Sequence, residues 1–86
     1  MFVMSIFDRK VGSYGRPIFC RALGEGMRIF RDEVNRPAED NILFKHPEDF
    51  DLYHVGSFDE ESGKLLPIVP VMLDTGVSSA KEVGRV

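Results

Sequence analysis

The residues best suited to chemistry lie in the segment 9–16, where cations flank a tyrosine on a loop that glycines make flexible. The segment contains Arg9, Lys10, Tyr14 and Arg16, with glycines at 12 and 15. Proteins that bind single-stranded DNA combine cations for the phosphates with aromatic faces on which bases stack, each stack contributing ~1–3 kcal/mol. The pattern therefore predicts a single-stranded DNA site in which Tyr14 stacks a base and the three cations contact phosphates.

Three more arginines, Arg21, Arg28 and Arg31, extend this basic track if the helix that follows lies alongside the loop. The alternative is a solvated connecting loop whose Tyr14 packs on the edge of the domain. Both interpretations fit the residue pattern.

Other chemistries find less support in the sequence. His46 and His54 with the carboxylates nearby do not form a defined ligand spacing, so we predict no metal site and no cofactor. The acids 59–61 are consecutive in an expected turn, which supplies no pocket to shift a pKa for acid–base work. Cys20 follows Phe19 in an apolar run and is expected to be a small buried residue. We therefore predict no catalytic residue and no enzymatic activity.

Length and composition limit the kinds of protein that this chain can be. With 86 residues the chain makes one domain, and its single cysteine cannot form an intrachain disulfide, which fits a reducing compartment. The net charge of −3 is unevenly distributed: residues 1–36 carry seven Lys/Arg against four acids, and residues 37–86 carry four against ten. This split predicts a basic and an acidic face, or ordinary solvated surface. No apolar run approaches the ~18 residues of a membrane span, so we expect no membrane association.

The pattern of apolar residues predicts a small α/β (α+β) domain in the order β-α-β-β. Residues 2–8 alternate with both faces largely apolar, as in a covered central strand. A turn through Pro17 leads to a helix beginning near Gly24 and ending before Pro37, with Met27, Phe30 and Val34 on one face. A helical turn at 47–49, a strand at 51–58 and a short return strand at 64–69 complete a mixed or antiparallel sheet with the helix packed on one face.

The predicted domain covers residues 1–70, and residues 71–86 form a C-terminal tail that docks or forms an interface. Pro67 and Pro70 are expected to shorten the return strand and to place it at a sheet edge. We expect self-association, as a homodimer or a higher oligomer, at this edge and at the apolar residues 71–73, by strand addition or tail docking.

Four segments in order resemble a known family: Tyr14–Phe19, Met27–Asn35, Leu43–Tyr53 with its Lys-His-Pro-Glu-Asp block, and Val55–Asp59. Together they are similar to the small non-structural protein of gokushovirus-type microviruses, which are single-stranded DNA phages. The similarity covers roughly residues 2–66, and the helix start at 23–26 is richer in glycine than the family pattern. It implies a protein absent from the capsid that acts in genome replication; single-stranded DNA binding is suggested for the family, but the resemblance does not identify the ligand.

These observations lead to one hypothesis and one alternative. The hypothesis is a phage non-structural replication accessory protein that binds single-stranded DNA in the host bacterial cytoplasm. The alternative is a protein-interaction module that binds the phage replication initiator or a host replication factor without direct DNA contact.

Overall fold

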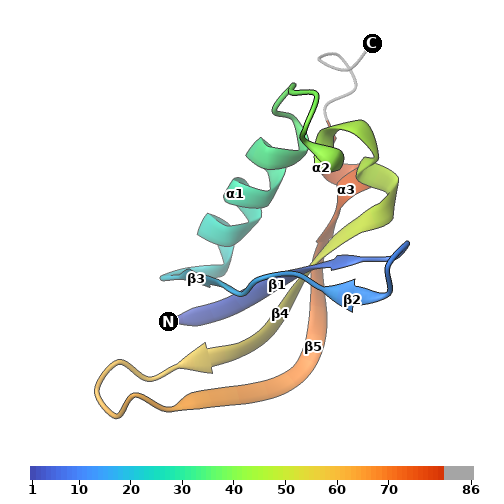
Figure 1. The fold of residues 1–86 in the computed structure, drawn as a ribbon. Helices are drawn as coiled ribbons and strands as arrows, with labels where there is room; N and C mark the ends of the chain where they lie inside the picture. The colour runs from blue at the N-terminus through green and yellow to red at the C-terminus, as the bar shows by residue number, and fades with distance from the viewer. Residues whose placement is uncertain (81–86) are drawn as a thin grey trace.

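The computed structural model describes residues 1–80, which form an antiparallel sheet with one main helix lying across one face (Figure 1). The strands are β1 (Phe2–Asp8), β2 (Ser13–Tyr14), β3 (Ile18–Cys20), β4 (Phe50–Phe58) and β5 (Leu65–Thr75). The main helix is α1 (Leu23–Val34), and the shorter helical segments are α2 (Ile42–Lys45), the 3-10 turn η1 (Pro47–Asp49) and α3 (Gly76–Ser79).

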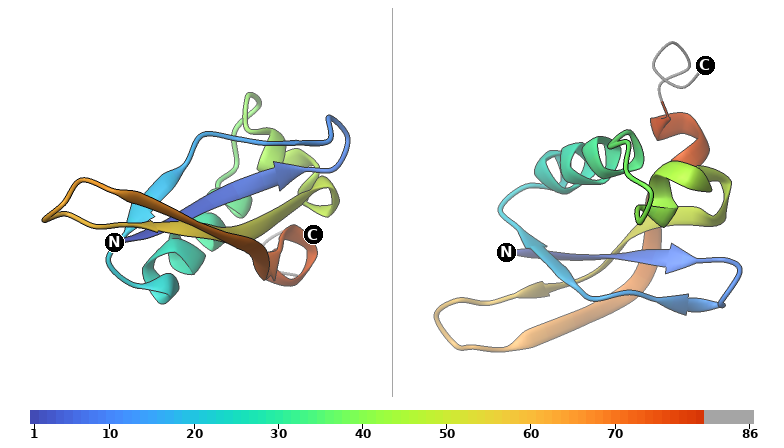
Figure 2. Two further views of the ribbon diagram at one scale, coloured as in Figure 1. Left: turned by 90° about the horizontal axis from the view of Figure 1, so that it is seen from below. Right: turned by 45° about the horizontal axis from the view of Figure 1, so that its top comes forward.

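Strands β1 and β4 form the middle of the sheet, whose order is β2-β1-β4-β5, and β3 pairs with β1 on the same side as β2. The pairs are antiparallel, with Ile6 opposite Leu52 and Phe7 opposite Tyr14. β1 has paired neighbours on both sides, which confirms the central strand predicted from the sequence; its residues 3–5 are buried and the others are half-buried. Figure 2 shows the β4–β5 hairpin extending away from α1.

The hydrophobic core lies between α1 and the sheet. Phe30 and Val34 of α1 are fully buried, and Met4 and Leu52 of the two central strands are buried beneath them. Each such side chain contributes about 1.5–3 kcal/mol through burial, so this layer is the main source of stability in so small a chain. The helix ends at Val34, in agreement with the prediction that it stops before Pro37.

The short helical segments gather at one end of the sheet, where α3 contacts both α1 and η1 (Figure 1). The Asn41 side chain accepts a hydrogen bond from the N–H of Leu43 and caps α2, and the Thr75 side chain caps α3 through the N–H of Ser78. Both use the short polar side chains that satisfy exposed N–H groups at helix starts.

The fold class is confirmed, and the sheet is antiparallel. The predicted β-α-β-β order lacked the two short strands β2 and β3. Residues 8–17 were expected to form a turn and contain β2, while residues 17–23 were expected to be either a short extended segment or the lead into the helix and contain β3; both strands add to the edge of β1. The predicted end of the return strand was wrong: the strand runs from Leu65 to Thr75 rather than ending at Val69, so β5 crosses from the predicted domain, residues 1–70, into the predicted tail, which begins at residue 71. Residues 81–86 of that tail lie outside the described residues. Within residues 1–80, no helix is long and apolar enough to cross a membrane.

Candidate nucleic-acid interface

The four predicted contact residues between positions 9 and 16 lie in the β1–β2 hairpin or directly after it. Its turn is closed by Asp8, whose carboxylate accepts hydrogen bonds from the N–H groups of Lys10 (2.9 Å) and Val11 (3.3 Å). Gly12 has a φ of 80°, a left-handed conformation that glycine adopts without strain. The polar turn therefore holds the cations at a defined end of the sheet and leaves Lys10 exposed.

Three aromatic rings lie together beside this turn, on the sheet face opposite α1. Ile6 packs toward the core, so the next residue, Phe7, points to the other face. The Phe7 ring centre lies 4.8 Å from that of Tyr14, and the Tyr53 ring of β4 lies 5.6 Å from Tyr14 and 6.2 Å from Phe7. Tyr14 remains 44% exposed. Its ring is thus supported by two neighbours and still has surface open to a ligand.

The three cations in and after the hairpin differ in whether they already contact acidic or carbonyl groups of the protein. The Arg9 guanidinium lies 3.2 Å from the carboxylate of Asp51, which is buried, and it also donates to the backbone carbonyl of Glu48. Lys10 and Arg16 are exposed and form no ion pair within residues 1–80. Arg9 therefore helps to hold the hairpin against β4, whereas Lys10 and Arg16 are the cations available to an external anion.

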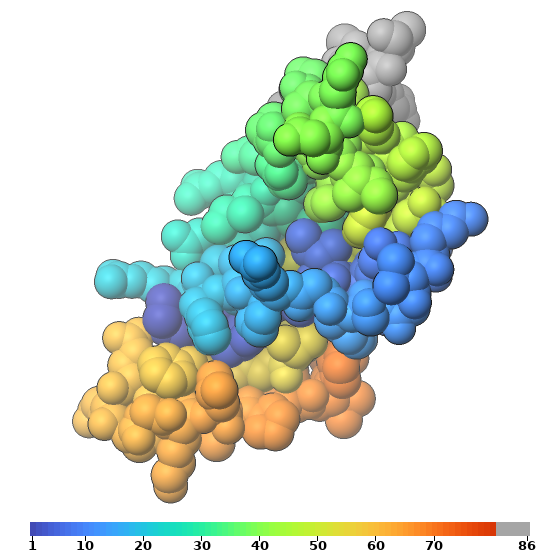
Figure 3. Space-filling view, viewed as in Figure 1, coloured from blue at the N-terminus to red at the C-terminus, as the bar shows by residue number. Residues whose placement is uncertain are grey.

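The remaining three predicted residues lie elsewhere. Arg21 precedes α1, and Arg28 and Arg31 are exposed on it. In the space-filling view the β1–β2 hairpin and α1 lie on different sides of the molecule (Figure 3). The arrangement on which the extended track depended, a helix alongside the loop, is not formed, and a role for these three arginines in binding stays a prediction.

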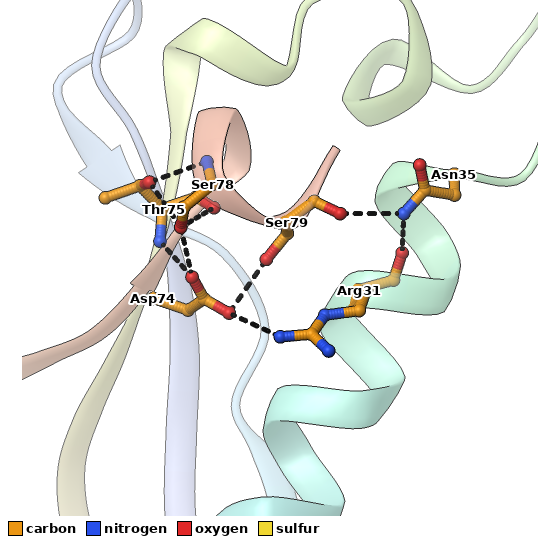
Figure 4. Close-up of polar contacts among 6 residues, drawn as sticks. All are labelled: Arg31, Asn35, Asp74, Thr75, Ser78 and Ser79. Atoms are coloured by element: carbon orange, nitrogen blue, oxygen red, sulfur yellow. Dashed lines mark hydrogen bonds and ion pairs between the residues drawn. The ribbon is translucent and has the colours of Figure 1, made fainter. Parts of the chain in front are cut away.

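Arg31 faces a polar network that fastens the end of β5 (Figure 4). Its guanidinium lies 3.9 Å from Asp74, and the Asp74 carboxylate accepts hydrogen bonds from the hydroxyls of Ser78 (2.6 Å) and Ser79 (2.8 Å) and from the N–H of Thr75 (2.8 Å). Burial raises the pKa of the Asp74 carboxyl, but these hydrogen bonds outweigh it and leave the pKa below its ordinary value. Arg31 and Asp74 thus serve to connect α1, β5 and α3.

Sequence reasoning missed part of the aromatic surface. Tyr53 joins the cluster only because β4 pairs with β1, and a second pair, Phe19 and Phe58, lies with ring centres 6.1 Å apart. Phe19 is 46% exposed, and its partner in β1, Val3, is on the face opposite Met4. The alternation of β4 was visible in the sequence, but the register that aligns these rings was not.

Comparison with known proteins assigns the family. The family model described as phage ORF5 protein matches residues 1–79. A curated relative, protein ORF5 of Chlamydia phage 1, is 44% identical over 88 residues, which cover 99% of this chain and 85% of the relative. The chain belongs to the phage ORF5 protein family. This confirms the resemblance to the small protein of gokushovirus-type microviruses. No solved structure matches the chain.

The histidines of this ORF5-family protein lie apart from the aromatic cluster and from one another. His54 packs its ring against Phe2 and makes a 2.9 Å hydrogen bond with the Gly56 carbonyl. The imidazole of His46 and the carboxylates of Glu48 and Asp49 have potential ligand atoms within 4.8 Å of one another. His46 and Glu48 are exposed, and their 3.6 Å contact is that of a surface pair at the start of η1.

Two further candidates for chemistry occupy settings that do not activate them. Cys20 is buried in the core, and burial, assisted by the charge of Glu25, raises the pKa of its thiol, so the reactive thiolate is disfavoured. The acids Asp59, Glu60 and Glu61 are exposed in the β4–β5 turn, where the Asp59 carboxylate accepts from the hydroxyl of Ser62 at 2.9 Å. These acids shape a turn and face solvent.

Proposed function

We propose that this ORF5-family protein is a non-structural replication accessory of a single-stranded DNA phage and binds single-stranded DNA through the β1–β2 hairpin. The observation that carries this proposal is the cluster of Phe7, Tyr14 and Tyr53 on the open face of the sheet, with the exposed cations Lys10 and Arg16 within four residues of Tyr14 in the chain.

Proteins hold single strands by stacking against the bases and by pairing cations with the phosphates. Bases are apolar on their faces, so a half-exposed Tyr14 that two other rings hold in place offers a stacking surface with little loss of side-chain freedom. The phosphates carry the charge, and binding them releases counterions, so each contacting cation adds to the salt dependence of the affinity. Lys10 and Arg16 lie in chain segments on both sides of Tyr14, which suits a strand whose base stacks between two phosphate contacts.

The test is fluorescence anisotropy of a labelled single strand of about 30 nucleotides, longer than the ~4–16 nucleotides that one small binding module occupies. The titration is made at about 50 and 200 mM salt, because phosphate contacts lose affinity over this range. We expect saturable binding that weakens with salt. Tyr14→Ala is expected to weaken binding by about 1–3 kcal/mol at both salt concentrations, and Lys10→Ala with Arg16→Ala to flatten the salt dependence.

Two control variants distinguish DNA binding at the hairpin from nonspecific electrostatic attraction. Lys45→Ala removes an exposed cation outside the hairpin, and Arg28→Ala removes one on α1. If the hairpin is the site, both variants bind nearly as the unmodified protein does. Equal losses from all single cation variants, with no effect of Tyr14→Ala, would instead mean nonspecific attraction and would reject the hairpin site.

A protein-interaction function is the alternative, with the phage replication initiator or a host replication factor as partner. One observation favours it: the apolar side chains of β5 are exposed over most of the strand. Absence of DNA binding at low salt and high protein concentration, with capture of the replication initiator in a pull-down, would establish it over DNA binding.

We further propose that the protein acts without catalysis, in the host bacterial cytoplasm. The protonated, buried Cys20 and the solvated acids at 59–61 support the first part of this proposal. A single buried cysteine fits the reducing environment of the second.

A further inference from the structure

A second pair of aromatic rings lies on the same sheet face as Phe7, Tyr14 and Tyr53, which we call the Tyr14 cluster. Phe19 is opposite Val3 in the β1–β3 pair, so these two side chains point to one face. Val3 and Phe7 are four positions apart in β1, and strand side chains at even spacings share a face. Because β2 and β3 pair with opposite ends of β1 (Figure 1), the open face carries aromatic rings at both ends.

The second pair, Phe19 and Phe58, lies in an apolar pocket of about 320 Å³. Met1 and Leu65 complete its lining, and none of these four residues has a charged side chain. The two ring centres are 6.1 Å apart with planes inclined by 66°, an edge-to-face contact, and Phe58 is itself fixed by two 2.8 Å hydrogen bonds with Met1. Phe19 is nevertheless 46% exposed, close to the 44% of Tyr14, so its ring is both supported and open to a ligand.

The distance between the Tyr14 cluster and the second pair suits a single strand. Four positions of β1, from Val3 to Phe7, correspond to ~13 Å at ~3.3 Å per residue. Nucleotides stacked in one strand are ~3.4 Å apart, so about four of them span this distance, and a more extended strand needs fewer. Small modules that bind single strands occupy ~4–16 nucleotides. A strand stacked on Tyr14 therefore reaches Phe19 within an ordinary site size.

An exposed cation follows the second pair in the chain. Arg21 is two residues after Phe19, directly beyond β3, and it forms no ion pair within residues 1–80. Its backbone N–H donates to the Glu25 carboxylate at 2.9 Å, which fixes the chain at this point. Both aromatic groups of the open face thus have an exposed cation within a few residues, as a ligand that alternates bases with phosphates requires.

The acidic turn 59–61 directly follows Phe58 and limits the path of a strand at this end. Its three side chains line a different pocket, which includes Ser57 and Leu66. Ser57 precedes Phe58 by one residue and is opposite Leu66, so both point to the other face of the sheet. Because the carboxylates of the turn repel phosphates, a bound strand ends at the second pair and does not continue over the β4–β5 turn.

We propose that Phe19 is a second base-stacking position, which holds a nucleobase of the same single strand that stacks on Tyr14, with Arg21 at the adjoining phosphate. Continuity with the Tyr14 cluster on one open face selects this occupant, because both places offer a half-exposed ring that a second ring supports. The inference rests on the DNA binding proposed above and extends that site to the far end of β1.

Fluorescence anisotropy with a labelled oligothymidine of about 12 nucleotides, within the usual site size, tests the proposal. Phe19→Leu keeps an apolar side chain without a ring and is expected to weaken binding at least about fivefold, the lower limit of a base stack. Phe19→Tyr keeps the ring and should bind nearly as the unmodified protein does. Arg21→Ala should reduce the salt slope by about one phosphate contact. The matched control is Ile29→Ala, which changes an apolar residue of α1 that is 44% exposed, and circular dichroism verifies that each variant is folded.

Photocrosslinking to an oligonucleotide that carries 5-iodouracil in place of thymine gives a second measurement, which locates the bases directly. We expect crosslinks at Phe19 or Phe58 in addition to the Tyr14 cluster. If Phe19→Leu binds like the unmodified protein, or if crosslinks are confined to the Tyr14 cluster, while Tyr14→Ala weakens binding, the second position is rejected and the hairpin site stands. If the unmodified protein binds no DNA, both proposals are overturned.

Discussion

Asp74→Ala provides the strongest test of how the end of β5 is held. The substitution removes an acceptor that binds the Ser78 and Ser79 hydroxyls and the Thr75 N–H. Ser79 is 2% exposed, so its hydroxyl loses its partner where water cannot easily replace it, at about 1–3 kcal/mol. The Ser78 hydroxyl and the Thr75 N–H are more exposed and add less, about 1 kcal/mol together.

The ion pair between Arg31 and Asp74 contributes little to the loss of stability that we expect for Asp74→Ala. The distance is 3.9 Å and the Arg31 side chain is 54% exposed, which are the conditions under which surface pairs give about 0–1 kcal/mol. We therefore expect Asp74→Ala to lower the free energy of unfolding by about 2–4 kcal/mol and Arg31→Ala by less than about 1 kcal/mol. For a domain of this size, 2–4 kcal/mol corresponds to a fall in Tm of roughly 10–25 °C.

The pH dependence of the free energy of unfolding provides a second test of the role of Asp74. Because the pKa of Asp74 is lowered in the folded state, its stabilising effect is fully present above the unfolded pKa of about 3.9 and is lost as the pH falls through the folded pKa. The difference between the unmodified protein and Asp74→Ala should therefore be constant near pH 7 and should narrow below about pH 4.

Thermal and urea unfolding followed by circular dichroism measure both effects. Asp40→Ala removes an exposed acid outside the network and serves as the control for net charge. The reasoning is refuted if Asp74→Ala unfolds like the Asp40→Ala control at pH 7, or if Arg31→Ala costs as much as Asp74→Ala. The second result would mean that the ion pair, and not the hydroxyl hydrogen bonds, holds the network.

Three further variants test the packing of the short helical segments and of α1, again by urea unfolding. Gly76→Ala places a methyl group against the Pro47 carbonyl and should destabilise the fold by about 1–3 kcal/mol, whereas Gly24→Ala, which has open space in α1, should stabilise it by about 0.5–1 kcal/mol. Asn41→Ala removes the cap of α2 on Leu43 and two hydrogen bonds to the carbonyls of Glu33 in α1 and of Arg36 just beyond it, for an expected loss of about 2–3 kcal/mol. Equal stability of the two glycine variants, or an Asn41→Ala loss under about 0.5 kcal/mol, would contradict these assignments.

The sequence predicted the elements whose signals are local. The α1 stripe, the alternation in β1 and β4 and the proline that starts η1 each lie within a few residues. β2 and β3 have two and three residues, and they are strands only because β1 lies beside them. The predicted end of β5 was wrong for a physical reason. Pro67 has its nitrogen at the open edge, and Pro70 lies where the β4–β5 register shifts, so the missing donors do not interrupt the pairing with β4.

The candidate site likewise combines residues that are close in the sequence with residues that only the fold brings near them. Arg9, Lys10, Tyr14 and Arg16 were found together because they are close in the sequence and the turn keeps them so. The participation of Tyr53 depends on the β1–β4 register, which joins residues more than 40 positions apart. Long-range partners such as Asp51 for Arg9 and Asp74 for Arg31 likewise leave no local pattern.

The prolines of β5 also bear on how the protein avoids amyloid. Cross-β fibres grow from segments of about six apolar residues without proline, in which every N–H and C=O pairs with the chains above and below. Pro67 and Pro70 leave only two residues, Ile68 and Val69, between them, and Asp74 ends the apolar run after Leu73. No window of β5 therefore satisfies the requirement, despite its apolar character. An apolar strand of this kind can therefore stay exposed at the edge of the sheet without offering a segment from which fibres grow.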